Sequence, residues 1–168
     1  MARSIAAVAA LALVLAGCGD SRSSDRKAGA SRTTSPTASA PSEPQPKPKP
    51  TGARVTLHGS DYGTILADGR GRALYLFTHD SAKSRCYGPC AKAWPPFYTK
   101  GRPRAQGGVK QGLLGAVRRS DGRTQATYDG HPLYYYVTDR APGQVTCQAV
   151  SEYGGYWYVV DRGGRAIR

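Results

Sequence analysis

The chain has 168 residues, with 24 Lys and Arg against 11 Asp and Glu and a formal net charge of +13 at pH 7. This length allows one folded domain of ordinary size and excludes an assembly of several large domains. A positive charge of this magnitude favours an anionic partner.

Residues 1–17 are predicted to form a secretory signal peptide. Arg3 precedes an apolar run of roughly 11 residues from Ile5 to Leu15, which is too short for a bilayer-spanning helix of about 20 residues. The next residues complete the sequence LAGC, which resembles the lipobox of bacterial lipoproteins. The resemblance implies cleavage before Cys18 and acylation of its thiol and new N-terminus by diacylglycerol and a fatty acid such as palmitate. Several acyl chains anchor a protein stably, whereas one does not. The alternative is an ordinary signal peptide with an incidental cysteine.

Residues 18–52, beginning at the lipidated cysteine, are predicted to form a disordered tether. Ser, Thr, Ala, Pro and Lys dominate this segment, which includes QPKPKP at residues 45–50. Such a composition cannot bury enough apolar surface to fold. The tether would reach between ~30 Å as a flexible coil and ~100 Å as a polyproline II helix. An alternative role for its lysines is contact with the cell wall.

Residues 53–168 are predicted to form one small all-β domain of antiparallel hairpins in a meander. Short runs rich in Tyr, Val and Leu alternate with glycine-containing turns, a pattern typical of strands, and no ten-residue window has helical spacing with caps. Asp-Gly and other glycine turns join these runs into hairpins, because Asp and Gly tolerate the positive φ of tight turns. The hairpin segments are residues 64–77, 116–128, 125–136 and 156–168.

A short sequence occurs twice in this domain, as LYLFTHD at residues 74–80 and LYYYVTD at residues 133–139. Each copy follows an Asp-Gly turn and is followed by a cysteine and then a tryptophan. The corresponding residues are Tyr75 and Tyr134, Cys86 and Cys147, and Trp94 and Trp157. We interpret this pattern as a duplicated supersecondary unit whose two copies pack on one another, because neither could bury a sheet face alone.

The two copies match the Yx(FWY)xxD signature of the bacterial secreted-repeat lipoproteins. The signature residues are Tyr75, Phe77 and Asp80 in the first copy and Tyr134, Tyr136 and Asp139 in the second. The segment CYGPCAKAWPPF at residues 86–97 resembles the Cys-x-Gly-x-Cys-Ala and Trp-Pro-Pro elements of the same family. The similarity covers nearly all of residues 57–167. It implies an exported, usually membrane-anchored repeat domain whose biochemical role is not established; typical members lack a cysteine at the position of Cys147.

Alternation along a strand places the signature aromatic residues of each copy on one face. We expect these residues to pack in the core, with the tyrosine hydroxyls reaching a polar partner or water. Apolar neighbours at Leu74, Leu76, Leu133 and Val137 indicate that both strand faces are covered. Asp80 and Asp139 are expected to cap turns at the strand ends. The alternative is a paired acidic site made by the two aspartates.

Three cysteines remain in the domain, and export favours a disulfide. Cys86 and Cys90 enclose three residues, a turn that can bring their α-carbons within bridging range. A bridge from Cys147 to either of them is the rival pairing. No cofactor is predicted, but the three thiols with His79 or His131 could instead bind zinc or Cu(I). Either histidine could also ligate haem, although no CxxCH motif for covalent attachment occurs.

Catalytic motifs are sparse. The sequence has no nucleophile elbow, no HExxH and no phosphate-binding glycine loop with its lysine. We therefore expect a protein without enzymatic activity.

The domain itself carries 17 Lys and Arg against eight Asp and Glu, a net charge of +9. Many basic residues fall between Lys83 and Arg123, including Lys100, Arg102, Arg104, Lys110, Arg118 and Arg119. An exported, anchored domain would meet lipid head groups and anionic wall polymers rather than nucleic acid. Solubility and an arginine-rich composition are the simplest explanation of the charge, and a salt-sensitive interaction with an anionic surface polymer is the alternative.

These patterns together predict a monomeric binding domain, lipid-anchored at the extracytoplasmic face of the cell membrane and without a nucleic-acid partner. A different class of protein is the alternative: a redox, metal- or haem-handling envelope protein that uses Cys86, Cys90, Cys147 and a histidine.

Overall fold

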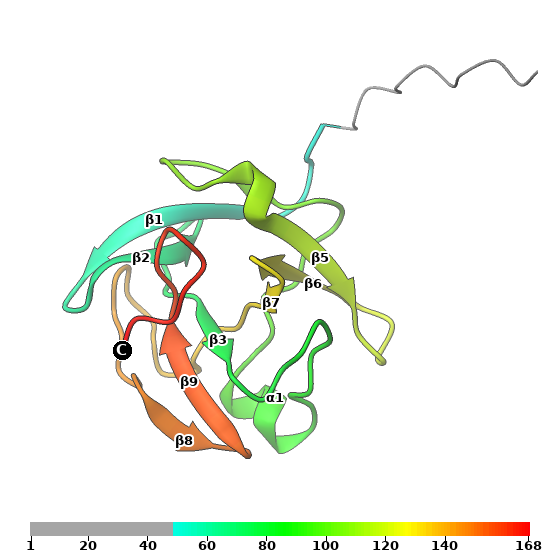
Figure 1. Cartoon of the computed structure of the whole chain (residues 1–168), viewed down its shortest axis with the longest axis vertical. Helices are drawn as coiled ribbons and strands as arrows, with labels where there is room; N and C mark the ends of the chain where they lie inside the picture. The colour runs from blue at the N-terminus through cyan, green and yellow to red at the C-terminus, as the bar shows by residue number, and fades with distance from the viewer. Residues whose placement is uncertain (1–48) are drawn as a thin grey trace, which may run out of the picture. The chain divides into compact units, whose positions relative to one another are not determined.

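The computed structural model describes residues 49–168, and these residues confirm the all-β prediction (Figure 1). A five-residue helix, α1 (Pro89–Ala93), and one 3-10 turn, η1 (Gln111–Leu113), interrupt the strands. Within residues 49–168 no helix is long and apolar enough to cross a membrane. The predicted signal peptide, Cys18 and the tether as far as residue 48 lie outside the described residues.

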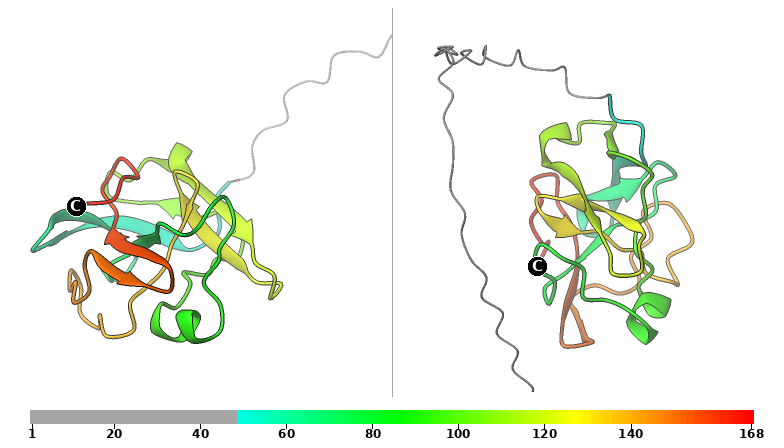
Figure 2. Two further views of the ribbon diagram at one scale, coloured as in Figure 1. Left: turned by 60° about the horizontal axis from the view of Figure 1, so that its bottom comes forward. Right: turned by 90° about the vertical axis from the view of Figure 1, so that its right-hand side faces the viewer.

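The strands form three small sheets, each of three strands (Figures 1 and 2). The strand order in the first sheet is β2 (Gly63–Asp68), β1 (Arg54–Ser60), β4 (Arg104–Ala105). In the second sheet the order is β5 (Leu114–Arg118), β6 (Thr124–Tyr128), β7 (His131–Pro132). In the third sheet it is β3 (Tyr75–Phe77), β9 (Gly155–Val159), β8 (Val150–Glu152). Neighbouring strands are antiparallel except β1 and β4, which pair in parallel over two residues and depart from the predicted hairpin pattern.

The predicted turns form where the sequence placed them. The turn at residues 119–123 joins β5 to β6, and Asp129 and Gly130 join β6 to β7 with φ of 48° and 79°, as a type I′ turn requires. Single bridges, Ala67 to Ala73 and a second one at the C-terminus, close the other two predicted hairpins. Two further hairpins, β1–β2 and β8–β9, were not predicted.

The two repeats are related by an approximate local two-fold axis at Tyr75 and Tyr134. The backbone N–H of each of these tyrosines donates to the carbonyl of the other, at 2.9 Å in both directions. Corresponding hydrogen bonds surround this pair in the two repeats. For example, the N–H of Leu74 donates to the carbonyl of Leu66, and that of Leu133 to the carbonyl of Ala126, at 3.0 Å each.

The repeats also exchange strands about this axis. Strand β9 of the second repeat pairs with β3 of the first. The segment at residues 93–98 of the first repeat pairs in the same way with the second, since the N–H groups of Tyr135 and Val137 donate to the carbonyls of Pro95 and Ala93 at 2.8 and 3.0 Å. Each copy therefore completes the other, which goes beyond the simple packing that the sequence predicted.

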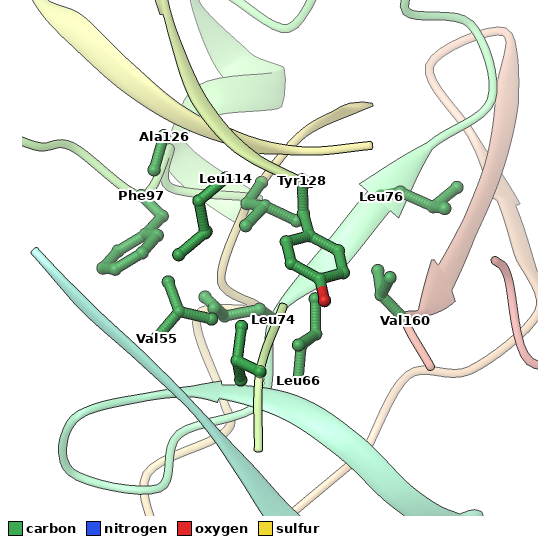
Figure 3. Packing of buried hydrophobic residues seen from close by; sticks show 11 residues of the cluster. Val55, Leu66, Leu74, Leu76, Phe97, Leu114, Ala126, Tyr128 and Val160 are labelled. Atoms are coloured by element: carbon green, nitrogen blue, oxygen red, sulfur yellow. The ribbon is translucent and has the colours of Figure 1, made fainter. Parts of the chain in front are cut away.

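Both faces of β3 are buried, as expected. Leu74 and Leu76 pack into one apolar cluster around Tyr128 (Figure 3), whereas Tyr75 and Phe77 face a second, aromatic cluster. At the centre of the second cluster the fully buried Trp94 and Trp157 stack with centroids 4.1 Å apart. The expectation fails at Val137, which is 46% exposed because the chain leaves the paired strand there and turns.

Candidate functional site

The signature tyrosines and aspartates bind one another across the two repeats. The Tyr75 hydroxyl donates to Oδ2 of Asp139 at 2.5 Å, and the Tyr134 hydroxyl donates to Oδ2 of Asp80 at 2.7 Å. Each repeat thus supplies the tyrosine for the other repeat's aspartate. The sequence predicted a polar partner for the hydroxyls but did not identify it, although the exact recurrence of the tyrosine and the aspartate in both copies was the available signal.

The carboxylate of each aspartate also closes the loop that follows it, rather than capping the turn at the end of its strand. Oδ1 of Asp80 accepts the N–H of Arg85 at 2.7 Å. Oδ1 of Asp139 accepts the N–H and the hydroxyl of Thr146 at 2.9 and 2.6 Å. The aspartates bind different tyrosines, so each completes a separate hydrogen-bonded group.

Burial controls the titration of these groups. Burial, followed by the bond to Asp139, raises the pKa of Tyr75 far above its usual value, and burial and the charge of Asp80 raise the pKa of Tyr134. Burial also raises the pKa of the Asp80 carboxyl, against the opposing effect of the hydrogen bonds it accepts. The tyrosines therefore remain protonated donors in the folded domain.

One of these pairs supports a buried arginine. The Tyr134 hydroxyl lies 2.7 Å from the hydroxyl of Ser84, which accepts a hydrogen bond from Nη1 of Arg119. Arg119 is only 4% exposed, and its guanidinium also donates to Oε1 of Gln125 at 2.7 Å and to the carbonyl of Cys86 at 2.6 Å. A buried guanidinium persists only when its donors are satisfied in this way.

The buried guanidinium lies between two open grooves on the surface. One is lined by Lys83, Ser84, Tyr87, Arg118, Arg119 and Ser120, and the other by Tyr98, Thr99, Lys100, Gly101, Arg123 and Thr124. Arg119 lies 4.2 Å from the Tyr87 ring and 6.0 Å from the Tyr98 ring, while Arg123 lies 4.2 Å from the Tyr98 ring. We call this surface the cationic strip: the exposed Lys83, Lys100, Arg118 and Arg123 around the buried Arg119.

The negative charge near the strip is small. Asp121 binds Arg123 Nη2 at 2.9 Å and Arg119 Nε at 3.3 Å, and hydrogen bonds from Arg123 lower the pKa of Asp121 to about 2. Within the described part of the chain, no acidic side chain lines either groove. The strip therefore keeps a positive field suited to an extended anion.

The structure brings together only part of the basic cluster noted in the sequence. Arg102, Arg104 and Lys110 line neither groove. Sequence reasoning did not single out Tyr87 and Tyr98, whose rings order the arginines. A tyrosine next to a cysteine-rich turn or a Pro-Pro-Phe segment gives no signal of its own for this role.

Cys86 and Cys90 form a disulfide, with α-carbons 5.3 Å apart. This confirms the favoured pairing and excludes the rival bridge to Cys147, which is not disulfide-bonded. The bridge closes the loop whose Cys86 carbonyl binds Arg119, so it helps to hold the strip in place. Burial raises the pKa of the Cys147 thiol and favours its protonated form.

The two histidines considered as ligands lie at strand ends. His79 is exposed after β3, and His131 begins β7. Residues 49–168 contain no group of three or more His, Cys, Asp and Glu placed to hold a metal. Two of the thiols considered for zinc or copper are bonded to each other and cannot serve as thiolate ligands in this state.

A family model described as a secreted repeat of unknown function matches the chain twice, over residues 57–98 and 115–161. Each matched segment contains one signature. Each also ends at or just after the tryptophan-containing strand segment that pairs with the other repeat. No curated protein and no solved structure matches the chain.

Proposed function

The chain belongs to the family of secreted repeats of unknown function, and from that membership we propose that it is a lipid-anchored binding module for an anionic polymer of the cell envelope. The cationic strip carries this proposal. Its four exposed cations and the buried guanidinium present positive charge in two neighbouring grooves, a surface that suits phosphate or carboxylate groups.

A polymer fits the strip better than a small anion. The charge is divided between two grooves, and the Arg119 guanidinium lies near Tyr87 of one groove and Tyr98 of the other, so a chain of anionic groups can engage both at once. Linked contacts of this kind strengthen one another, because the second group binds at a high effective concentration. The N–H groups of Arg119 already donate hydrogen bonds within the protein, so its side chain cannot move to follow a ligand. Arg119 therefore acts as a fixed charge between the grooves.

The anchor is the second part of the proposal and rests on the LAGC sequence ending at Cys18. Metabolic labelling with radioactive palmitate is expected to label the protein in the membrane fraction. Cys18→Ser removes the acylated thiol and should abolish the label, whereas Cys147→Ser, which removes the other thiol outside the disulfide, should retain it. Undiminished labelling of the Cys18→Ser variant would contradict the anchor.

Neutralising the strip is expected to weaken binding of a linear polyphosphate. Each cation near an anionic surface contributes about 1 kcal/mol, so the triple variant Lys83→Gln, Arg118→Gln, Arg123→Gln should bind roughly 100-fold more weakly. Binding is measured by fluorescence anisotropy with labelled polyphosphate and the full chain in non-ionic detergent. Fold integrity is checked by thermal unfolding.

The matched control removes the same charge elsewhere. Arg70, Arg140 and Arg162 are exposed and line neither groove. Replacing these three with Gln should change the dissociation constant by less than about threefold if the strip is the site. Equal losses in the two triple variants would show that only total charge matters and would contradict the proposal.

A further inference from the structure

A third groove, of about 460 Å³, lies outside the cationic strip where the two repeats and the C-terminal segment meet. It is lined by Leu76, Phe77, Thr78, Asp80, Asp129, His131, Gly164, Arg165, Ala166 and Arg168. Residues from the first repeat thus form one wall, the turn at Asp129 a second, and the C-terminal segment a third.

The local two-fold axis gives this groove an internal counterpart. There the side chain of Arg72 reaches from the first repeat onto the second. Its Nε donates to the carbonyl of Asp139 at 3.0 Å and its Nη2 to the carbonyl of Tyr136 at 3.4 Å. Its guanidinium also lies 4.2 Å from the centre of the Tyr135 ring. The counterpart is therefore a guanidinium site filled by the chain's own arginine.

The third groove lacks this internal occupant. His131 stands two residues before Leu133, as Arg72 stands two residues before Leu74, so a shorter side chain takes the position of the arginine. By the same offset, Phe77 and Asp80 correspond to the two residues whose carbonyls bind Arg72. The repeat symmetry thus places a second set of guanidinium acceptors at this groove. Within residues 49–168 no arginine fills it as Arg72 fills the counterpart, because Arg165 pairs with Asp161 and Arg168 lies over the Tyr158 ring.

The charged side chains that line the groove specify the rest of the ligand. Asp129 supplies an exposed carboxylate, whereas both oxygens of Asp80 already accept hydrogen bonds. Arg165 and Arg168 line the C-terminal wall, and these cations would repel a ligand that carried only positive charge. A ligand that carries both a cation and a carboxylate complements both the aspartate and the two arginines.

We propose that the third groove binds a basic amino acid of the arginine type, free or as the last residue of a peptide. Its guanidinium lies against Asp129 and the carbonyls of Phe77 and Asp80, and its carboxylate faces Arg165 and Arg168. This site is independent of the proposed polymer site and goes beyond it.

Isothermal titration calorimetry of the full chain in non-ionic detergent tests the proposal with four probes. L-Arginine should bind. Citrulline, which has no charge on its side chain, should bind at least about tenfold more weakly, because charged hydrogen bonds are lost. Agmatine, which lacks the carboxylate, should also bind more weakly. Nα-acetylarginine distinguishes the two sources: binding as tight as arginine indicates a peptide end, and weaker binding indicates the free amino acid.

Two variants test the location. His131→Arg supplies the guanidinium that Arg72 supplies at the counterpart, so it should abolish arginine binding without lowering the Tm. Asp129→Asn should weaken binding about tenfold or more, since Asn tolerates the same positive φ but carries no charge. The matched control, Asp61→Asn, alters an exposed carboxylate in the β1–β2 turn and should leave binding unchanged.

The triple variant of the cationic strip should bind arginine normally, which separates this site from the proposed polymer site. Failure of the unaltered protein to bind arginine at millimolar concentration would overturn the inference. So would arginine binding that survives unchanged in both His131→Arg and Asp129→Asn.

Discussion

Fragments 49–107 and 108–168, made by cutting between Gly107 and Gly108, are each expected to be unfolded alone and to fold when mixed in equal amounts. The cut falls in an exposed loop between β4 and η1, so it breaks no strand. Each fragment contains one whole repeat but lacks the strand segment that the other repeat contributes. An isolated repeat would leave strand edges unpaired and its apolar face open to water.

The packing of the aromatic cluster also leads us to expect that each fragment alone is unfolded. Trp94 and Trp157 come from different repeats, and both are fully buried with their rings stacked on each other. Separating them exposes two of the largest side chains in the domain. Circular dichroism and proton NMR of each fragment, and of the mixture against uncut 49–168, are the measurement. A well-dispersed NMR spectrum from either fragment alone would contradict strand exchange as the basis of the fold.

Asp139→Ala is expected to lower the free energy of unfolding by about 3 to 5 kcal/mol. Asp139 is 1% exposed and accepts hydrogen bonds from the Tyr75 hydroxyl and from the N–H and hydroxyl of Thr146. Its removal leaves the buried Tyr75 hydroxyl without its acceptor and releases the two Thr146 donors. Tyr75→Phe removes one donor and should cost about 1.5 to 3 kcal/mol.

Urea unfolding of the two single variants and the double variant measures the coupling of this pair. The double variant should lose less than the sum of the single losses, because both changes remove the same hydrogen bond. Asp61→Ala, at an exposed turn, is the control and should change stability by less than about 0.5 kcal/mol. Strictly additive losses would show that Tyr75 and Asp139 do not stabilise the fold as a pair.

The pH dependence of stability provides a second readout of the same pair. The pKa of Tyr75 is raised in the folded domain, whereas an unfolded tyrosine ionises near about 10. Above that pH the unfolded chain releases a proton that the folded chain retains, so stability falls as pH rises. The free energy of unfolding falls by about 1.4 kcal/mol per pH unit for each such tyrosine. The Tyr75→Phe variant should therefore show a slope smaller by that amount.

The sequence alone predicted the strand class and the main turns, because these depend on neighbouring residues. Asp129 and Gly130 specify their turn through their own φ preferences. Cys86 and Cys90 are only four positions apart, and this spacing favoured the local disulfide over the rival bridge to Cys147. Such features need no knowledge of distant partners.

Strand exchange could not be predicted in this way, because alternation shows which face of a strand is buried but not which strand lies beside it. Tyr75 and Asp139 are 64 residues apart, and nothing local to either residue indicates their bond. The burial of Arg119 could not be predicted either, because a basic residue that follows Arg118 in a charged turn is usually exposed. These features depend on the way the two repeats interlock.

The salt dependence of polyphosphate binding tests the proposed function most directly. If four exposed cations displace counterions from the polymer, the logarithm of the association constant should fall with the logarithm of salt concentration at a slope of roughly −3, and the triple variant of the strip should show a slope near about −1. A dissociation constant that does not change with salt, or a slope that the triple variant leaves unaltered, would contradict the cationic strip as the binding site.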